Sequence, residues 1–217
     1  MSAHVYMTEA ELTHLGSAYR DAKVILEYGS GGATRLAADM PGKLIMSVDC
    51  DLERIRRLRR DLANASSPAM FQHVDIGRTG FDGRPLTDRN WRAYHRYPNS
   101  VWDEPWFRQP DTLFIAGPFR SACLATAILR TKKPVRVIFD GYALDERYKL
   151  VEHIVKPRKV IGRMAEFLVN PDGFAADDIG YLVGQYFQVE PAGKGEDNLR
   201  QPQPDLGPNG PTGELSS

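Results

Sequence analysis

Three acidic residues could form one ligand site, because each stands at or near the end of a short apolar segment. Glu27 lies in the run KVILEYG, Asp49 ends the run KLIMSVD, and Asp75 ends the run AMFQHVD. The carboxyl ends of neighbouring parallel strands meet at one edge of a sheet, where such sheets bind ligands. Carboxylates accept hydrogen bonds, so these residues suit a ligand that carries hydroxyl or amino groups.

A glycine-rich turn follows Glu27 directly, in the stretch EYGSGGATRLAAD. We expect Gly29 to take the positive φ of a tight turn, and Gly31 and Gly32 to leave the backbone bare for a ligand. The N–H groups that begin the next helix could face a negative group of that ligand. Asp49 follows about twenty residues later, a position from which a carboxylate binds the ribose hydroxyls of an adenosine ligand.

Asp75 has two interpretations at this stage. It could accept a hydrogen bond from an adenine amino group, or it could cap the turn that it begins. Glu27 would repel a phosphate, so the glycine turn favours a ligand with hydroxyl or ammonium groups over a pyrophosphate.

Alternating strands and helices would position these residues. Apolar runs predict strands at 23–29, 43–49, 69–75, 111–117 and 134–140, and two more strands at 158–169 around Gly162 and Arg163. Periodic segments predict helices at 8–22, 32–40, 51–64, 121–131, 145–155 and 177–187. We therefore expect an α/β fold: a mostly parallel, doubly wound, Rossmann-like seven-stranded sheet with a C-terminal antiparallel hairpin.

One domain suits a chain of 217 residues. We expect it to span residues 1–190, with an insertion at 76–109 that holds all three tryptophans and many other aromatic residues. The aromatic residues of the insertion allow two interpretations: a lid over a substrate pocket, or a cluster of rings that fastens a long loop. Residues 191–217 are rich in Pro, Gly and charge, which predicts a disordered tail.

Composition argues against several classes of partner. Lysine and arginine together number 28 and so do the acids, so the net charge of zero favours neither nucleic acid nor an anionic membrane. No apolar run approaches the roughly 20 residues of a membrane helix, and the first residues show no signal pattern, so we expect a cytoplasmic protein. The basic segment at 54–61 is interpreted as the solvated face of a helix.

The cysteines and histidines give little indication of disulfide, metal-binding or catalytic chemistry. Cys50 and Cys123 are too few for a disulfide framework or a structural zinc site, and we interpret them as small buried residues. His73 lies in a predicted strand, and His95 lies in the insertion, where a solvated loop residue is the favoured interpretation. No set of His, Asp and Glu has the spacing of a metal site.

In order and spacing, the motifs LEYGSGGATRLAAD, SVDCD and VDIG resemble those of class I S-adenosylmethionine-dependent methyltransferases. The resemblance covers about residues 8–169 and extends to a group of bacterial methyltransferase-like proteins of undefined function. It implies S-adenosylmethionine as the cofactor, bordered by seven residues of this chain. These are Glu27, Gly29, Ser30 and Gly31 at its methionine part, Asp49 at its ribose, and Asp75 and Ile76 at its adenine.

Two motifs depart from the pattern of that group. Where its members carry DGRFR and FDDY, this chain has AGPFR at 116–120 and FDGY at 139–142, so Ala116 replaces the acid after the fourth strand. Methyl transfer needs an aligned nucleophile and is helped by a general base. The candidates for catalysis are Asp140, as a base, a substrate-orienting group or a turn cap; Arg120, as a carboxylate clamp or a surface ion-pair partner; and Tyr142, near the same rim.

Three functions follow from these residues. The first is an S-adenosylmethionine-dependent methyltransferase that acts on a small molecule. The second is a protein that retains the S-adenosylmethionine or S-adenosylhomocysteine pocket but has impaired catalysis. The third is an NAD-dependent oxidoreductase, against which Thr34 counts because it occupies the third glycine position of that fingerprint. The sequence leaves the methyl acceptor and the oligomeric state open.

Overall fold

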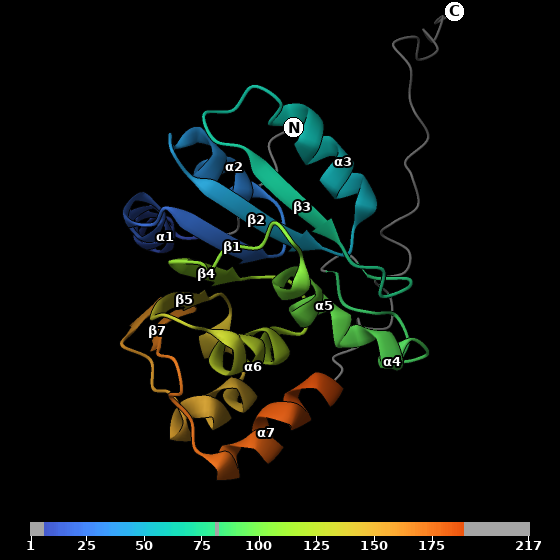
Figure 1. The fold of residues 1–217 in the computed structure, drawn as a ribbon, viewed down its shortest axis with the longest axis vertical. Helices are drawn as coiled ribbons and strands as arrows, with labels where there is room; N and C mark the ends of the chain where they lie inside the picture. The colour runs from blue at the N-terminus through green and yellow to red at the C-terminus, as the bar shows by residue number, and fades with distance from the viewer. Residues whose placement is uncertain (1–6, 81–82, 189–217) are drawn as a thin grey trace, which may run out of the picture.

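The computed structural model describes residues 7–80 and 83–188, and within them seven strands form one sheet in the order β3-β2-β1-β4-β5-β7-β6 (Figure 1). The strands are β1 Val24–Tyr28, β2 Leu44–Asp49, β3 Ala69–His73, β4 Thr112–Ile115, β5 Val135–Phe139, β6 Lys159–Ile161 and β7 Met164–Val169. The helices before β4 are α1 Glu9–Asp21, α2 Gly32–Asp39, α3 Leu52–Asp61, α4 Trp91–Tyr94, α5 Arg96–Asn99 and the 3-10 helix η1 Ser100–Asp103. Those after β4 are α6 Arg120–Arg130, η2 Tyr142–Leu144, η3 Glu146–His153, η4 Ala176–Asp178, α7 Ile179–Gly184 and η5 Gln185–Phe187.

The sheet is mixed but mostly parallel. The strands β1 to β5 pair in parallel, whereas β7 pairs antiparallel with both β5 and β6. Apolar runs in the sequence locate β1, β2, β4 and β5 because strands covered on both faces bury nearly every residue, whereas the edge strand β3 buries only Phe71. The predicted α/β class and mostly parallel seven-stranded sheet are confirmed.

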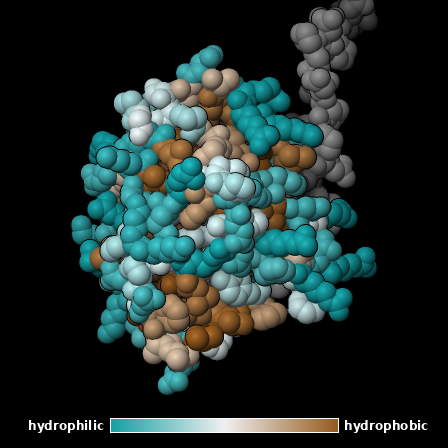
Figure 2. Space-filling view, in the orientation of Figure 1, coloured by the Kyte–Doolittle hydropathy of each residue, from teal (hydrophilic) through white to brown (hydrophobic). Residues whose placement is uncertain are grey.

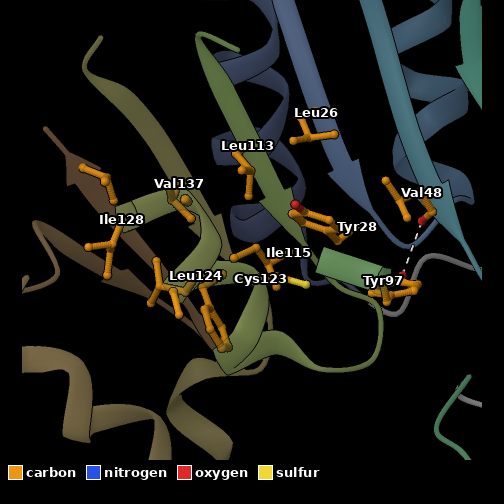
Figure 3. Close-up of a cluster of buried hydrophobic side chains, with 14 of the residues drawn as sticks. Leu26, Tyr28, Val48, Tyr97, Leu113, Ile115, Cys123, Leu124, Ile128 and Val137 are labelled. Atoms are coloured by element: carbon orange, nitrogen blue, oxygen red, sulfur yellow. Dashed lines mark hydrogen bonds between the residues drawn. The ribbon is translucent and has the colours of Figure 1, made fainter. Parts of the chain in front are cut away.

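Side chains alternate between the two faces of the sheet and build a core on each. Ile25 and Phe114 belong to the cluster that packs against α1 and α2. Their neighbours Leu26 and Leu113 belong to the larger cluster on the opposite face, with α6 and the insertion (Figure 3). The helices α1, α2 and α3 therefore cover one face, while α5 and α6 cover the other.

Two predicted helices take a different form. Within the predicted helix at 145–155, residues Glu146–His153 form the 3-10 helix η3 instead of an α-helix. Its buried side chains, Tyr148 and Val151, are three residues apart and Leu150 is 58% exposed, which matches the three residues per turn of a 3-10 helix. Residues 177–187 divide into η4, α7 and η5, with Gly180 inside α7 and Gly184 at its end, where glycine weakens an α-helix.

The insertion packs into the main core. Tyr94, Tyr97 and Trp102 are buried in the same cluster as the strands. The Trp102 indole N–H donates to the Tyr28 hydroxyl at 2.7 Å, and that hydroxyl donates to the Pro98 carbonyl at 2.5 Å. These contacts fasten η1 and α5 to the end of β1, as the ring-cluster interpretation expects.

The surface view shows polar side chains over most of one face and an apolar group at its lower end, where Figure 1 places α7 (Figure 2). On α7, Ile179 is 45% and Val183 is 43% exposed. Among the described helices, none combines the length and apolar character needed to cross a membrane. The predicted tail at 191–217 and Phe81 of the insertion lie outside the described residues.

Candidate functional site

The glycine turn lies where β1 separates β2 from β4, the position at which connections leave the sheet in opposite directions. Gly29 has φ of +100°, as the sequence predicts, and its N–H donates to the Val48 carbonyl at 2.8 Å. A Cβ atom at Gly29 would lie 2.7 Å from the backbone nitrogen of Gly117, so the backbones after β1 and β4 touch. Both the dihedral and the contact require glycine at this position.

Glu27 faces the helices α1 and α2. Its carboxylate accepts hydrogen bonds from the Tyr19 hydroxyl at 2.7 Å, the Thr34 hydroxyl at 2.6 Å and the Ser47 hydroxyl at 3.2 Å, and the residue is fully buried. Burial raises the pKa of Glu27 to about 7, and the three hydrogen bonds oppose this rise. In this arrangement Glu27 ties α1 and α2 to the sheet.

Asp49 joins the end of β2 to the glycine turn. Its carboxylate accepts from the Ser30 N–H and the Asp51 N–H, each at 2.8 Å, and it is 1% exposed. The Ser30 hydroxyl also lies 2.7 Å from that of Ser47. Asp49 therefore lies against the glycine turn, as the spacing of the two motifs predicts.

Arg54 is a member of this site that the sequence interpretation missed. Its Nη1 lies 3.1 Å from one Asp49 oxygen and 3.4 Å from the other, instead of facing solvent. Burial lowers the pKa of Arg54, but Asp49 and Asp51 outweigh that effect and raise it. The available signal was its position in the first turn of α3, three residues after the helix cap Asp51.

The remaining predicted cofactor residues differ in exposure. The side chain of Asp75 is exposed and accepts from the Gly77 N–H at 2.8 Å, which is the turn-capping interaction. Ile76 is 1% exposed and belongs to the large core cluster. At Gly31, a Cβ atom would meet nothing within 4 Å, so open space borders the backbone there.

Tyr97 of the insertion lies over the junction of β1, β2 and β4. Its hydroxyl donates to the Val48 carbonyl at 3.3 Å (Figure 3), and a Cβ atom on Gly117 would overlap the hydroxyl oxygen. Burial raises the pKa of Tyr97, so the hydroxyl stays protonated. The aromatic composition of the insertion was visible in the sequence, but this placement was not.

The three candidate catalytic residues have different surroundings. The Asp140 carboxylate accepts from Arg163, with Nε at 2.7 Å and Nη2 at 3.2 Å. The Tyr142 hydroxyl donates to Glu152 at 2.6 Å, and burial together with that carboxylate raises the pKa of Tyr142. Arg120 donates to backbone carbonyls, and it alone of the three lines a pocket of about 260 Å³ beyond β4 and β5.

The pocket is separate from the predicted cofactor residues. Its wall includes Gly117, Arg120, Ser121, Gly141, Asp145 and Gln185. None of the seven residues assigned to S-adenosylmethionine lines it. The described residues therefore contain two neighbouring features: the glycine turn with Asp49, and the pocket with Arg120.

The histidines and cysteines considered in the sequence lie outside the glycine turn and the pocket wall. His73 Nε2 lies 3.3 Å from the Cys50 carbonyl, and His95 is exposed. Burial raises the pKa of the Cys50 thiol to about 12 and also raises that of Cys123, which is fully buried. Neither thiol forms a thiolate readily at neutral pH.

No family model matches this sequence, and no curated protein matches it. Among solved structures, the chain is similar to a methyltransferase-like protein from Silicibacter pomeroyi DSS-3, with a TM-score of 0.80 and 34% identity over 86% of this chain and 98% of that chain. The chain belongs to this methyltransferase-like family. A hypothetical protein from Thermus thermophilus matches at a TM-score of 0.45 and 15% identity, over 78% of this chain and 91% of that chain, and adds nothing to the assignment.

In this methyltransferase-like protein, the Asp49 carboxylate shares its acceptor sites between backbone N–H groups and Arg54. A carboxylate offers about four acceptor sites. The N–H groups of Ser30 and Asp51 each bind one oxygen, and Arg54 Nη1 spans the remaining site on each at the longer distances of 3.1 and 3.4 Å. If Arg54 moved away, these two acceptor sites would match the two hydroxyls of a ribose in number.

Proposed function

We propose that this methyltransferase-like chain binds S-adenosylmethionine at the ends of β1 and β2 and transfers its methyl group to a small molecule. The observation that carries the proposal is the 2.8 Å contact between the Asp49 carboxylate and the Ser30 N–H, which brings the acid to the glycine turn. The open space beside Gly31 supports it, because a ligand can lie against bare backbone there.

The cofactor, Asp49 and Glu27 each have a different role in this proposal. The cofactor, when bound, supplies a methyl group activated by a sulfonium centre. Asp49 binds the ribose hydroxyls after Arg54 turns away, while its contacts with Ser30 and Asp51 keep the turn in place. Glu27 holds α1 and α2 against β1, so the turn that follows β1 begins from a fixed position. Orientation of this kind supplies much of the rate enhancement in methyl transfer.

Titration calorimetry with S-adenosylhomocysteine and with NAD tests cofactor binding. We expect S-adenosylhomocysteine to bind and Asp49→Asn to weaken it at least about tenfold, since the ribose loses a charged acceptor. Asp61→Asn is the matched control, because that carboxylate pairs with Arg35 on the surface. Binding of NAD without S-adenosylhomocysteine would support the oxidoreductase alternative and refute the proposal.

A small-molecule acceptor is supported by the zero net charge of the chain and by the pairing of Arg54 with Asp49 and of Arg56 with Glu53 within the basic segment. Incubation with methyl-labelled cofactor and separate cell-extract fractions tests this part. We expect label in the small-molecule fraction. Label found only in RNA or in protein would refute the acceptor class and leave cofactor binding intact.

A second function, cofactor binding with impaired catalysis, is favoured by one specific observation. Ala116 offers no carboxylate after β4, and both oxygens of Asp140 accept hydrogen bonds from Arg163. A free carboxylate base is therefore missing from both positions. If labelled cofactor reacts only after Ala116→Asp, this second function is correct; turnover by the unaltered chain supports the first.

A further inference from the structure

The pocket beyond β4 and β5 contains an arginine that is fixed in place by the backbone. Arg120 Nε donates to the Gly117 carbonyl and Nη2 donates to the Ala116 carbonyl, both at 3.2 Å. A Cβ atom at Gly141 would overlap Nη1, so the guanidinium rests against this glycine. The side chain is half-buried, and its orientation is set before any ligand arrives.

The charge of Arg120 has no carboxylate partner among the described residues. Other half-buried arginines do have one: Arg54 pairs with Asp49, and Arg163 with Asp140. The acid in the pocket wall, Asp145, caps η3 and pairs with Arg147. A partly desolvated cation without a counter-charge is unfavourable, and an anionic ligand would remove that penalty.

Two further groups of the pocket wall support a ligand with polar parts. The helix α6 has 11 residues and begins at Arg120, after Phe119 with φ of +57°, so no side chain caps its first-turn N–H groups. Ser121 of this turn lines the pocket, where N–H groups and the helix dipole favour an anion. Gln185 is 5% exposed and donates to the Tyr181 carbonyl at 3.0 Å, and no described residue donates to its amide oxygen.

We propose that the methyl acceptor is a small organic anion, a carboxylate or a phosphate ester, bound in this pocket by Arg120 and the first turn of α6. The amide oxygen of Gln185 accepts from a hydroxyl or amino group of the same molecule. The role of the anion as methyl acceptor rests on the proposed function, whereas the anion site itself follows from the pocket. The Arg120 N–H groups that make no bond to these carbonyls, together with a helix terminus, suit carboxylate and phosphate alike.

Ligand-observed NMR on the full chain, without cofactor, tests the site with matched pairs of probes. The pairs are 4-hydroxybenzoate with 4-hydroxybenzamide, and phenyl phosphate with phenol, so that each anion has a neutral counterpart and the two anion types are compared. We expect at least one anion to bind and its neutral counterpart to bind at least about tenfold more weakly, as for hydrogen bonds to charged groups. Arg120→Gln should lose this preference, while Arg35→Gln, which removes a surface charge, should keep it.

A second variant keeps the test decisive if Arg120→Gln does not fold. Ser121→Asp places a carboxylate at the helix N-terminus, where it stabilises α6, and beside Arg120, where it competes with the anion. We expect an unchanged or higher Tm together with loss of anion binding. Anion binding that survives Ser121→Asp, or equal binding of anions and neutral counterparts, would overturn the inference.

Failure of this inference and failure of the proposed function give different results. Binding of S-adenosylhomocysteine without selective anion binding would overturn the anionic acceptor and leave the methyltransferase proposal intact. Selective anion binding without S-adenosylhomocysteine binding would refute the methyltransferase proposal and, with it, the acceptor role of this pocket.

Discussion

Glu27 predicts an unusual dependence of stability on pH. Burial raises its pKa from 4.5 to about 7, so the folded chain holds this proton more tightly than the unfolded chain does. Between pH 4.5 and about 7 the folded state therefore binds more protons at this site, and the contribution of Glu27 to stability falls as pH rises. Above about pH 7 the carboxyl is ionised in both states and the contribution no longer changes.

The size of the effect follows from the two pKa values. Their difference corresponds to about 3 kcal/mol in the free energy of unfolding, a large part of the stability of an ordinary domain. Glu27→Gln removes the titration and keeps an acceptor for the Tyr19 hydroxyl. We expect the free energy of unfolding of Glu27→Gln, measured relative to the unaltered chain, to rise by about 3 kcal/mol between pH 4 and pH 8.

Urea unfolding at several pH values measures this difference directly. Comparison with the variant cancels the titration of all other groups, and Glu9→Gln on the surface of α1 serves as the control for the loss of one carboxyl group. A flat difference for Glu27→Gln, or one of the opposite sign, would show that the carboxylate is not buried as the structure places it.

Three further variants test the glycine turn and its acid. Gly29→Ala should lower the free energy of unfolding by at least about 2 kcal/mol in urea, because its φ is +100° and its Cβ would meet Gly117 at 2.7 Å; a neutral effect would contradict that contact. Gly31→Ala should change stability by less than about 1 kcal/mol and yet weaken S-adenosylhomocysteine at least about tenfold in calorimetry, because its Cβ would enter open space on the ligand side. Arg54→Gln should strengthen the same ligand about fivefold, since an ion pair with Asp49 worth about 1 kcal/mol no longer competes; weaker binding would instead make Arg54 a cofactor ligand.

The sequence predicted the features that depend on local pattern. Four of the five parallel strands, β1, β2, β4 and β5, follow from apolar runs, and the positive φ of Gly29 follows from the tight turn between β1 and α2. The methyltransferase resemblance followed from three motifs in order and is confirmed by the Silicibacter pomeroyi structure.

Features that depend on which face a residue occupies could not be predicted in the same way. A strand buried on both sides gives no periodicity, so nothing in KVILEYG shows that Glu27 faces α1 and α2. Arg54 was interpreted as solvated because it belongs to the basic segment at 54–61. Its contact with Asp49 depends on the direction in which α3 leaves β2. The pairing of Asp140 with Arg163 joins residues that are separated by 23 positions and depends on how β7 returns beside β5.

The contact between Gly29 and Gly117 places the glycine turn directly beside the wall of the Arg120 pocket. Gly29 belongs to the turn assigned to the cofactor, and Gly117 belongs to the wall of the Arg120 pocket. At this point the backbones of the turn and of the pocket wall touch without a side chain between them. A molecule held against the Gly29 turn and a molecule in the pocket would therefore lie close together, and a side chain at either glycine would force the two backbones apart.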